Sequence, residues 1–329
     1  MKKQTILIVL GLLLSSHDMY FKPGAYFLEP NSAASIELYN GTFERSENTI
    51  DRNRMIDVSL VGGGKRLAVD SSQWKEVEGV TVLDFIAGDA GTWVAGLSTY
   101  PKNIELAANE FNEYLEHDGV LDMLVWREEN GELNSDAIEK YSKHVKTIFQ
   151  VGETLTDDWK TVLGYPIEFI PLENPYDLHS GHAMKVKLLW QGEPLANQLV
   201  YVGSEVESHD HGDGEAHSHE GTEAEADHEH DALQQLRTDA QGVVTFDISH
   251  QGVWYLRTIY MALSEEEGLT HESNWATLTF QVGDGHSHHA TEVHEHDNED
   301  VWGIPSYVYW VGSLLLLFGL FYWFNKRKG

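Results

Sequence analysis

Histidines dominate the chemistry that this sequence can perform. Eleven of its 18 histidines lie in two short stretches, 205–231 and 284–300, mostly as His-x-His pairs interleaved with Asp and Glu and without Lys or Arg. They are His209, His211, His217, His219, His228 and His230 in the first stretch, and His286, His288, His289, His294 and His296 in the second. Imidazole and carboxylate are ligands for Zn, Ni, Co and Cu(II), so both stretches are predicted to bind divalent metal. The alternative is an acidic, disordered linker in which histidine is incidental.

The chemistry of such stretches favours capture over catalysis. A ligating imidazole must be neutral, so binding is expected to weaken as pH falls through the histidine range. Low-complexity clusters bind several metals in several registers, whereas a catalytic centre needs a preorganised ligand shell. The stretches therefore predict metal capture or buffering.

Two further histidines are spaced for metal binding in a loop. His179 and His182 flank Ser180 and Gly181, and two histidines three residues apart in a turn can share one ion if a third ligand arrives from elsewhere. His250 and His271 are expected in loops at the same end of the fold and are candidates for that third ligand. The alternative is that these are solvated loop histidines.

Composition narrows the classes of partner. The formal net charge is −31, and the two stretches hold 17 of the 53 acidic residues. This charge argues against nucleic acid as a partner and favours cations. The absence of cysteine excludes a disulfide framework, thiolate metal sites, a lipoprotein anchor and a cysteine nucleophile.

Both ends of the chain carry targeting signals. Residues 1–16 have a basic start, an apolar run over 6–14 and a small-residue end, which predicts a cleaved signal peptide. Residues 301–324 have the length, the terminal aromatic residues and the following basic residues of a transmembrane helix, with 325–329 as a cytoplasmic tail. We therefore expect a single-pass protein of the inner (cell) membrane whose body lies in the periplasm or extracytoplasmic space.

Signal cleavage would create one more candidate ligand. If the signal is cut after Ser16, His17 becomes the first residue of the mature chain. A terminal histidine can chelate through its α-amine and its ring together, and with a second histidine it could hold copper in a T-shaped brace. An ordinary exposed N-terminus is the alternative.

Between these ends the sequence predicts a mainly β protein with two antiparallel β-sandwich-like domains, 17–100 and 163–283. Short apolar runs separated by turn residues predict strands at 33–39, 55–61, 80–86, 92–98, 167–170, 184–190, 199–202, 243–248, 253–260 and 276–282. The first histidine-rich stretch interrupts the second domain, and 284–300 links that domain to the membrane helix. Gly62, Gly63 and Gly64 predict a hairpin turn, because Arg66 stands where a phosphate-binding loop requires Ser or Thr.

A small α-helical insert is expected over 101–162. Ala107, Phe111, Tyr114 and Leu115 recur at helical spacing, and Gly119 stands where a left-handed C-terminal cap would. A second helix is predicted from an N-cap at Ser135, with Ile138, Tyr141, Val145 and Ile148 as its apolar stripe. His117 and His144 would then be surface or capping residues of these helices.

The order of short motifs resembles one known family. The motifs are His17-Asp18-Met19-Tyr20-Phe21; Gly91-Thr92-Trp93; Leu97-Ser98-Thr99 with Pro101-Lys102; Phe111-Asn112-Glu113-Tyr114-Leu115 with Gly119; Tyr141-Ser142-Lys143 before Lys146; Pro171-Leu172-Glu173-Asn174-Pro175-Tyr176; and Gly192-Glu193-Pro194-Leu195. Over about 17–282 the chain is similar to the nickel uptake substrate-specific transmembrane family, often catalogued only as a domain of unknown function. The resemblance implies metal uptake or homeostasis outside the cytoplasm. The histidine-rich insertions are not part of the family pattern.

Three functions compete. The leading hypothesis is a membrane-anchored extracytoplasmic protein, not an enzyme, that captures Ni, Zn, Co or Cu and presents it to a partner membrane transporter. A copper-dependent oxidative enzyme built on His17 is the second. A structural or carbohydrate-binding β-sandwich, kept solvated by its acidic loops, is the third.

Overall fold

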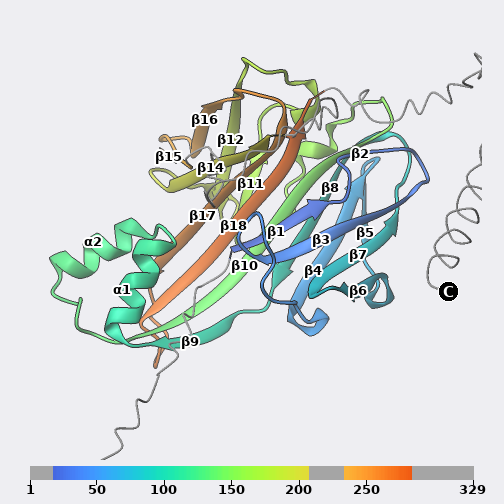
Figure 1. Cartoon of the computed structure of the whole chain (residues 1–329). Coiled ribbons are helices and arrows are strands. Elements are labelled where there is room, and N and C mark those ends of the chain that lie inside the picture. The colour runs from blue at the N-terminus through green and yellow to red at the C-terminus, as the bar shows by residue number, and fades with distance from the viewer. Residues whose placement is uncertain (1–17, 207–232, 284–329) are drawn as a thin grey trace, which may run out of the picture. The chain divides into compact units, whose positions relative to one another are not determined.

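The computed structural model describes residues 18–206 and 233–283 (Figure 1). Chain contacts divide the protein into two units, Met1–Gly283 and Asp284–Gly329, and every described residue belongs to the first. Within the described residues neither helix is long and apolar enough to cross a membrane. The predicted signal peptide, first histidine-rich insertion, linker, transmembrane helix and tail lie almost entirely outside the described residues.

The described fold is mainly β, as predicted, with three sheets and two short helices among these residues. A four-stranded N-terminal sheet has the order β1 (Asp18–Pro23), β3 (Ala33–Gly41), β7 (Val80–Ile86), β6 (Trp74–Val77). A small C-terminal sheet has the order β11 (Ile167–Pro171), β12 (Ala183–Trp190), β13 (Glu193–Pro194), with β16 (Val243–Asp247) also paired to β12.

A ten-stranded central sheet contains strands from both the N-terminal and the C-terminal half of the described chain (Figure 1). Its order is β15 (Gln234–Arg237), β14 (Leu199–Val206), β17 (Gly252–Leu263), β18 (His271–Val282), β10 (Ala137–Val151), β8 (Gly91–Thr99), β4 (Met55–Gly62), β5 (Lys65–Ala68), with β2 (Phe27–Leu28) and β9 (Lys102–Leu106) paired to β10. The strand predictions hold at these positions, but the expected division into two antiparallel sandwich domains is wrong. Strands from both halves share this sheet, and the sheet is mixed because β10 and β18 run parallel.

The predicted helix starting at Ser135 is wrong, because these residues form the 15-residue strand β10. β10 pairs with β18 from Glu139↔His271 to Thr147↔Thr279 and with β8 on its other side. Its C-terminal half is buried on both faces, so the alternation that marks a half-exposed strand is absent. Branched and aromatic residues that fit a helical stripe equally suit a strand, and long-range pairing decides between them. The insert is therefore helical only within residues 108–129.

The helix predicted around Phe111 is confirmed as α1 (Ala108–His117), which buries Phe111, Tyr114 and Leu115. Gly119 follows it with φ +74°, a left-handed conformation that favours glycine. A second helix, α2 (Leu121–Glu129), was not predicted, because its buried face includes a charged residue, Arg127. Four 3₁₀ turns complete the elements: η1 (Arg52–Arg54), η2 (Ser71–Gln73), η3 (Asp157–Lys160) and η4 (Pro175–Asp177). The turn between β4 and β5 is the predicted hairpin.

Hydrophobic cores lie on both faces of the central sheet. One, with Trp254 and Phe280, packs against the C-terminal sheet, and another, with Phe21 and Phe149, packs under the N-terminal sheet. A third lies beneath α1 and α2. β1 crosses the central sheet closely, and the Thr277 hydroxyl donates to the Met19 carbonyl at 2.6 Å.

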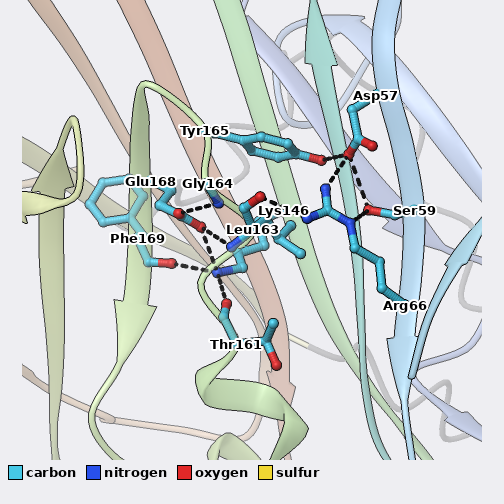
Figure 2. Close-up of polar contacts among 10 residues, drawn as sticks. All are labelled: Asp57, Ser59, Arg66, Lys146, Thr161, Leu163, Gly164, Tyr165, Glu168 and Phe169. Atoms are coloured by element: carbon cyan, nitrogen blue, oxygen red, sulfur yellow. Dashed lines mark hydrogen bonds and ion pairs between the residues drawn. The ribbon is translucent and has the colours of Figure 1, made fainter. Parts of the chain in front are cut away.

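A buried ion pair joins the central and C-terminal sheets (Figure 2). Lys146 of β10 and Glu168 of β11 lie 3.2 Å apart, with side chains 2% and 3% exposed. The Lys146 ammonium also donates to the carbonyls of Thr161 and Phe169, at 2.9 and 3.1 Å. Burial lowers the pKa of Lys146, and Glu168 partly offsets this effect. The ammonium is thus held by three acceptors in the interior.

The same close-up shows how the segment before β11 is fixed (Figure 2). The Glu168 carboxylate accepts from the backbone N–H groups of Leu163 and Gly164, at 3.0 and 2.9 Å. The Tyr165 hydroxyl donates to Asp57 at 2.7 Å, and the Arg66 guanidinium contacts the same carboxylate oxygen at 2.8 Å. Side chains from β4 and β5 therefore bind a segment that enters the C-terminal sheet.

Candidate functional site

The two histidine-rich stretches join the described fold at one end of the central sheet. β14 ends at Val206, within the start of the first stretch, and β18 ends at Val282, just before the second. Both residues pair with Gly252, the first residue of β17. Strand β17 lies between β14 and β18 in the sheet (Figure 1). Neighbouring strands are about 4.8 Å apart, so the Cα atoms of Val206 and Val282 are separated by roughly 10 Å. The chain leaves the fold toward both stretches from the same place.

The first stretch is inserted into a hairpin at the edge of the sheet. β14 and β15 pair from Leu199↔Arg237 to Val202↔Gln234, and β15 is the outermost strand. A hairpin connection can lengthen at small entropic cost, since the closure term grows only logarithmically with loop length. The insertion therefore leaves the pairing of the described strands intact.

His179 and His182 lie together in an exposed turn at the start of β12. Their ring centroids are 6.0 Å apart, with the ring planes inclined by 54°. The His182 N–H donates to the His179 carbonyl at 3.2 Å, and Gly181 between them has φ +92°. A residue with a side chain would be strained at that φ, so glycine makes this turn possible. The two imidazoles therefore lie side by side, and their role as metal ligands stays a prediction.

His250 lies in the connection that faces this turn. The Gly181 N–H donates to the Ile248 carbonyl at 2.7 Å, and the Ser180 hydroxyl donates to the Ser249 carbonyl at 2.9 Å. The His250 ring stacks on Trp254 with centroids 5.0 Å apart. His250 is also only two residues before Gly252. The end of the sheet that leads to both stretches therefore carries His250, with His179 and His182 on the turn bonded to its connection.

His271 is not part of this group, and its assignment as a loop ligand is wrong. It is the first residue of β18, whose 12 residues place it about 36 Å from Val282 at 3.3 Å per residue. It is 3% exposed, and burial together with Arg127 lowers its pKa to about 4. Pairing with β10 and β17 extends β18 five residues upstream of its predicted start, which turns the expected loop into strand.

Of the remaining histidines, the structure describes only His117 and His144. His117 is exposed beside Asp118, with Nδ1 2.8 Å from Oδ1. His144 is buried in β10 between Ser98 and Asn274, and burial lowers its pKa to about 4. This corrects its expected helix-surface position. His17 and the eleven histidines of the two stretches lie outside the described residues.

A complete metal centre is not formed by the described part of the chain. In residues 18–206 and 233–283 no three His, Asp or Glu side chains are grouped closely enough to hold a metal ion. His179 and His182 are thus a two-imidazole pair with open positions for other ligands. Such a pair can bind Zn, Cu or Ni ions whose coordination is completed by water.

A second cluster of chemically unusual groups lies in the interior beside α1. Arg257 of β17 contacts Asp18 of β1 through Nε at 3.4 Å and donates to the Asp118 carbonyl at 3.0 Å. Burial and the like charge of Asp18 raise the pKa of Asp118 to about 6, although His117 and Arg257 oppose the shift. Among the described residues, Asp118 Oδ2 is buried without a hydrogen-bond partner.

Two residues of β10 extend this cluster. Burial raises the pKa of Glu139 to about 7, although its carboxylate accepts from the hydroxyls of Tyr114 and Ser273. Burial lowers the pKa of Lys143 to about 8, and its ammonium lies 4.8 Å from the centre of the Trp275 ring. Perturbed groups of this kind occur both at functional sites and in structural networks. Here they connect β1, α1 and β17 with β10.

Sequence reasoning missed this cluster because β10 was interpreted as a helix. Glu139 and Lys143 are four residues apart, which in a helix would place them on one exposed face as an ordinary ion pair. In a strand both point to the same face, which α1 and β1 cover. The sequence signal that could have indicated a strand is the two-residue spacing that places Ala137, Glu139, Lys143 and Val145 on one face.

These observations define a mainly β protein in which three described histidines, His179, His182 and His250, lie near the end of the central sheet from which the chain leaves toward both stretches. The sequence profile of DUF4198, described as a domain of unknown function, matches residues 14–262. Because the match covers well over half of the chain, the protein belongs to this family. The expected membership of a family of unknown function is confirmed at that level.

Other comparisons add no functional assignment. No curated protein matches the chain. The D0-D1 domain of intimin matches at 12% identity over 80% of this chain and 97% of its own, with a TM-score of 0.17. Alpha-2-macroglobulin from Escherichia coli matches at 12% over 82% and 16%, and a putative membrane anchored protein from Corynebacterium diphtheriae at 9% over 81% and 59%, both with a TM-score of 0.20. Similarity this low supports no argument about this chain.

Proposed function

We propose that this chain captures divalent transition metal outside the cytoplasm and presents it to a membrane uptake system. The observation that carries the proposal is the pairing of Val206 and Val282 with the same residue, Gly252. Two stretches rich in histidine and acid, far apart in sequence, are therefore attached to one end of one sheet. The exposed His179–His182 turn and His250 lie at that end as well.

The chemistry of the stretches suits collection of Ni, Zn, Co or Cu ions. Each offers several neutral imidazoles beside carboxylates, and neither contains a competing Lys or Arg. An ion held by a tethered segment is presented to ligands near the attachment point at an effective concentration of millimolar order when the tether is short. Capture by these segments would therefore supply metal to the histidine-bearing end of the fold.

The proposed location follows from the two ends of the chain. Residues 1–16 would direct export and be removed, and residues 301–324 would anchor the protein in the inner membrane with 325–329 in the cytoplasm. One spanning helix cannot enclose a polar pathway, so a separate transporter would carry the ion across. The resemblance to the nickel uptake family supports this metal context.

The proposal is tested in the full chain by replacing the histidines of the two stretches in one variant and their acidic residues in another. One variant replaces the eleven histidines of the stretches with Gln, and its matched control replaces their acids with Asn or Gln and keeps the histidines. Metal content after equilibrium dialysis with Zn, Ni or Cu(II) is measured at pH 7. We expect the histidine variant to lose more than one ion per chain and the acid variant to lose fewer.

The pH dependence gives a second readout. Wild-type binding should fall mainly between about pH 7 and 5, where histidine with an ordinary pKa near 6.5 becomes protonated. Equal metal content in wild type and the histidine variant would refute capture by the stretches. Retention of a single tight copper site that is lost on His17→Ala would favour the copper-enzyme alternative instead.

A further inference from the structure

We infer that His179 and His182 form a fixed, open site for one divalent transition-metal ion, separate from the two histidine-rich stretches. The inference rests on the proposed function only for the source of the metal. The site itself is built entirely from described residues. Three features of the structure support it: the anchoring of the turn, the spacing of the rings and the open coordination positions.

The turn that carries the two histidines is held at both sides. Leu178 before it is 6% exposed and Met184 after it is fully buried, so both flanks are fixed in the core. The Ile248 N–H donates to the His182 carbonyl at 2.8 Å, and the Ser180 hydroxyl is bonded to the facing connection. A site whose backbone is already ordered loses little conformational entropy when a metal binds.

The ring spacing matches a shared metal ion. With a metal–nitrogen distance of about 2.0–2.1 Å, two imidazoles on one ion have centroids roughly 5 Å apart in tetrahedral geometry and about 6 Å apart when they are trans. The observed centroid distance of 6.0 Å lies within this range. Both rings are exposed, so rotation about their side-chain bonds can direct a nitrogen of each toward one ion.

Two protein ligands leave the remaining positions open. Such a site binds more weakly than a closed four-ligand site and exchanges its ion more easily. His250 lies in the connection bonded to this turn, where its Nδ1 is 2.9 Å from the Ser249 hydroxyl. An exchangeable site beside the attachment point of both stretches suits transfer of the ion rather than its storage.

The experiment uses the full chain in which the eleven stretch histidines are replaced with Gln. Cu(II) is titrated at pH 7.5, and binding is followed by dialysis and by electron paramagnetic resonance. We expect one ion per chain, with a spectrum showing nitrogen coordination. Adding His179→Ala or His182→Ala should weaken its binding at least about tenfold, since even changes around a ligand often cost 10–100-fold in metal affinity.

Matched controls separate this site from other histidines. His117→Ala removes an exposed histidine on α1, away from the turn, and should leave Cu(II) binding unchanged. Absence of a residual ion, or an unchanged affinity in His182→Ala, overturns the inference, as does loss of the ion on His17→Ala alone. Full metal retention when the stretch histidines are replaced would refute the proposed function but not this site. The two ideas therefore fail independently.

Discussion

Breaking the buried ion pair between Lys146 and Glu168 should destabilise the protein strongly. Glu168→Gln leaves the ammonium in the interior, 2% exposed, without a countercharge, with two backbone carbonyls still accepting from it. Removing one partner of a buried pair typically costs about 3–5 kcal/mol, because the other charge stays buried without compensation. Gln also has one acceptor oxygen where the carboxylate had two, so the N–H groups of Leu163 and Gly164 compete for it. We expect Glu168→Gln to lower the free energy of unfolding by about 3–5 kcal/mol.

The assay is equilibrium urea unfolding of the full chain followed by circular dichroism, together with a thermal scan. For a folded body of this size, an unfolding entropy of about 2.1 cal/mol/K per residue converts 3–5 kcal/mol into a fall in Tm of roughly 5–9 °C. The matched control is Asp157→Asn, which removes the exposed partner of Lys160, and it should cost less than about 1 kcal/mol. The double variant Lys146→Met with Glu168→Gln should lose less than the sum of the two single changes. A loss below about 1 kcal/mol in Glu168→Gln would contradict the reasoning.

Three further predictions concern other parts of the fold. Glu139 has its folded-state pKa raised from 4.5 to about 7, so its full contribution to stability is present below pH 4.5 and is lost as pH rises through about 7. A shift of one pKa unit corresponds to about 1.4 kcal/mol, so the unfolding free energy of Glu139→Gln minus that of the wild type should rise by about 3 kcal/mol between pH 4 and pH 8. Urea titrations at several pH values measure this difference, and a difference that does not change with pH would contradict the prediction. Gly62→Ala should cost about 1–3 kcal/mol, because its Cβ would lie 2.1 Å from the buried Trp93 ring, and unchanged thermal unfolding would refute that packing argument. Replacing residues 207–231 with a short turn should change the Tm of the metal-free protein by less than about 2 °C, since acidic low-complexity sequence adds little to a packed core, whereas a large fall would show that the insertion stabilises the fold.

Elements whose signals lie within a few residues were predictable from the sequence. The strands around Val58 and Val94, the α1 helix and the glycine turn at Gly63 are where the local pattern places them. The pair His179 and His182 is also local, because a tight turn is enough to bring the rings together. Local propensity and spacing act over a handful of residues, so such features do not depend on the rest of the chain.

Only the tertiary structure decided the features that depend on strand pairing. The residues of β10 fit a helix or a strand equally well, and their position between β8 and β18 selects the strand and joins the two halves of the chain in one sheet. The same pairing buries Glu139 and removes His271 from the candidate site. The register that places Val206 and Val282 on either side of Gly252 is likewise absent from any local pattern. Register between distant strands is set by the whole buried face, which no short window of sequence contains.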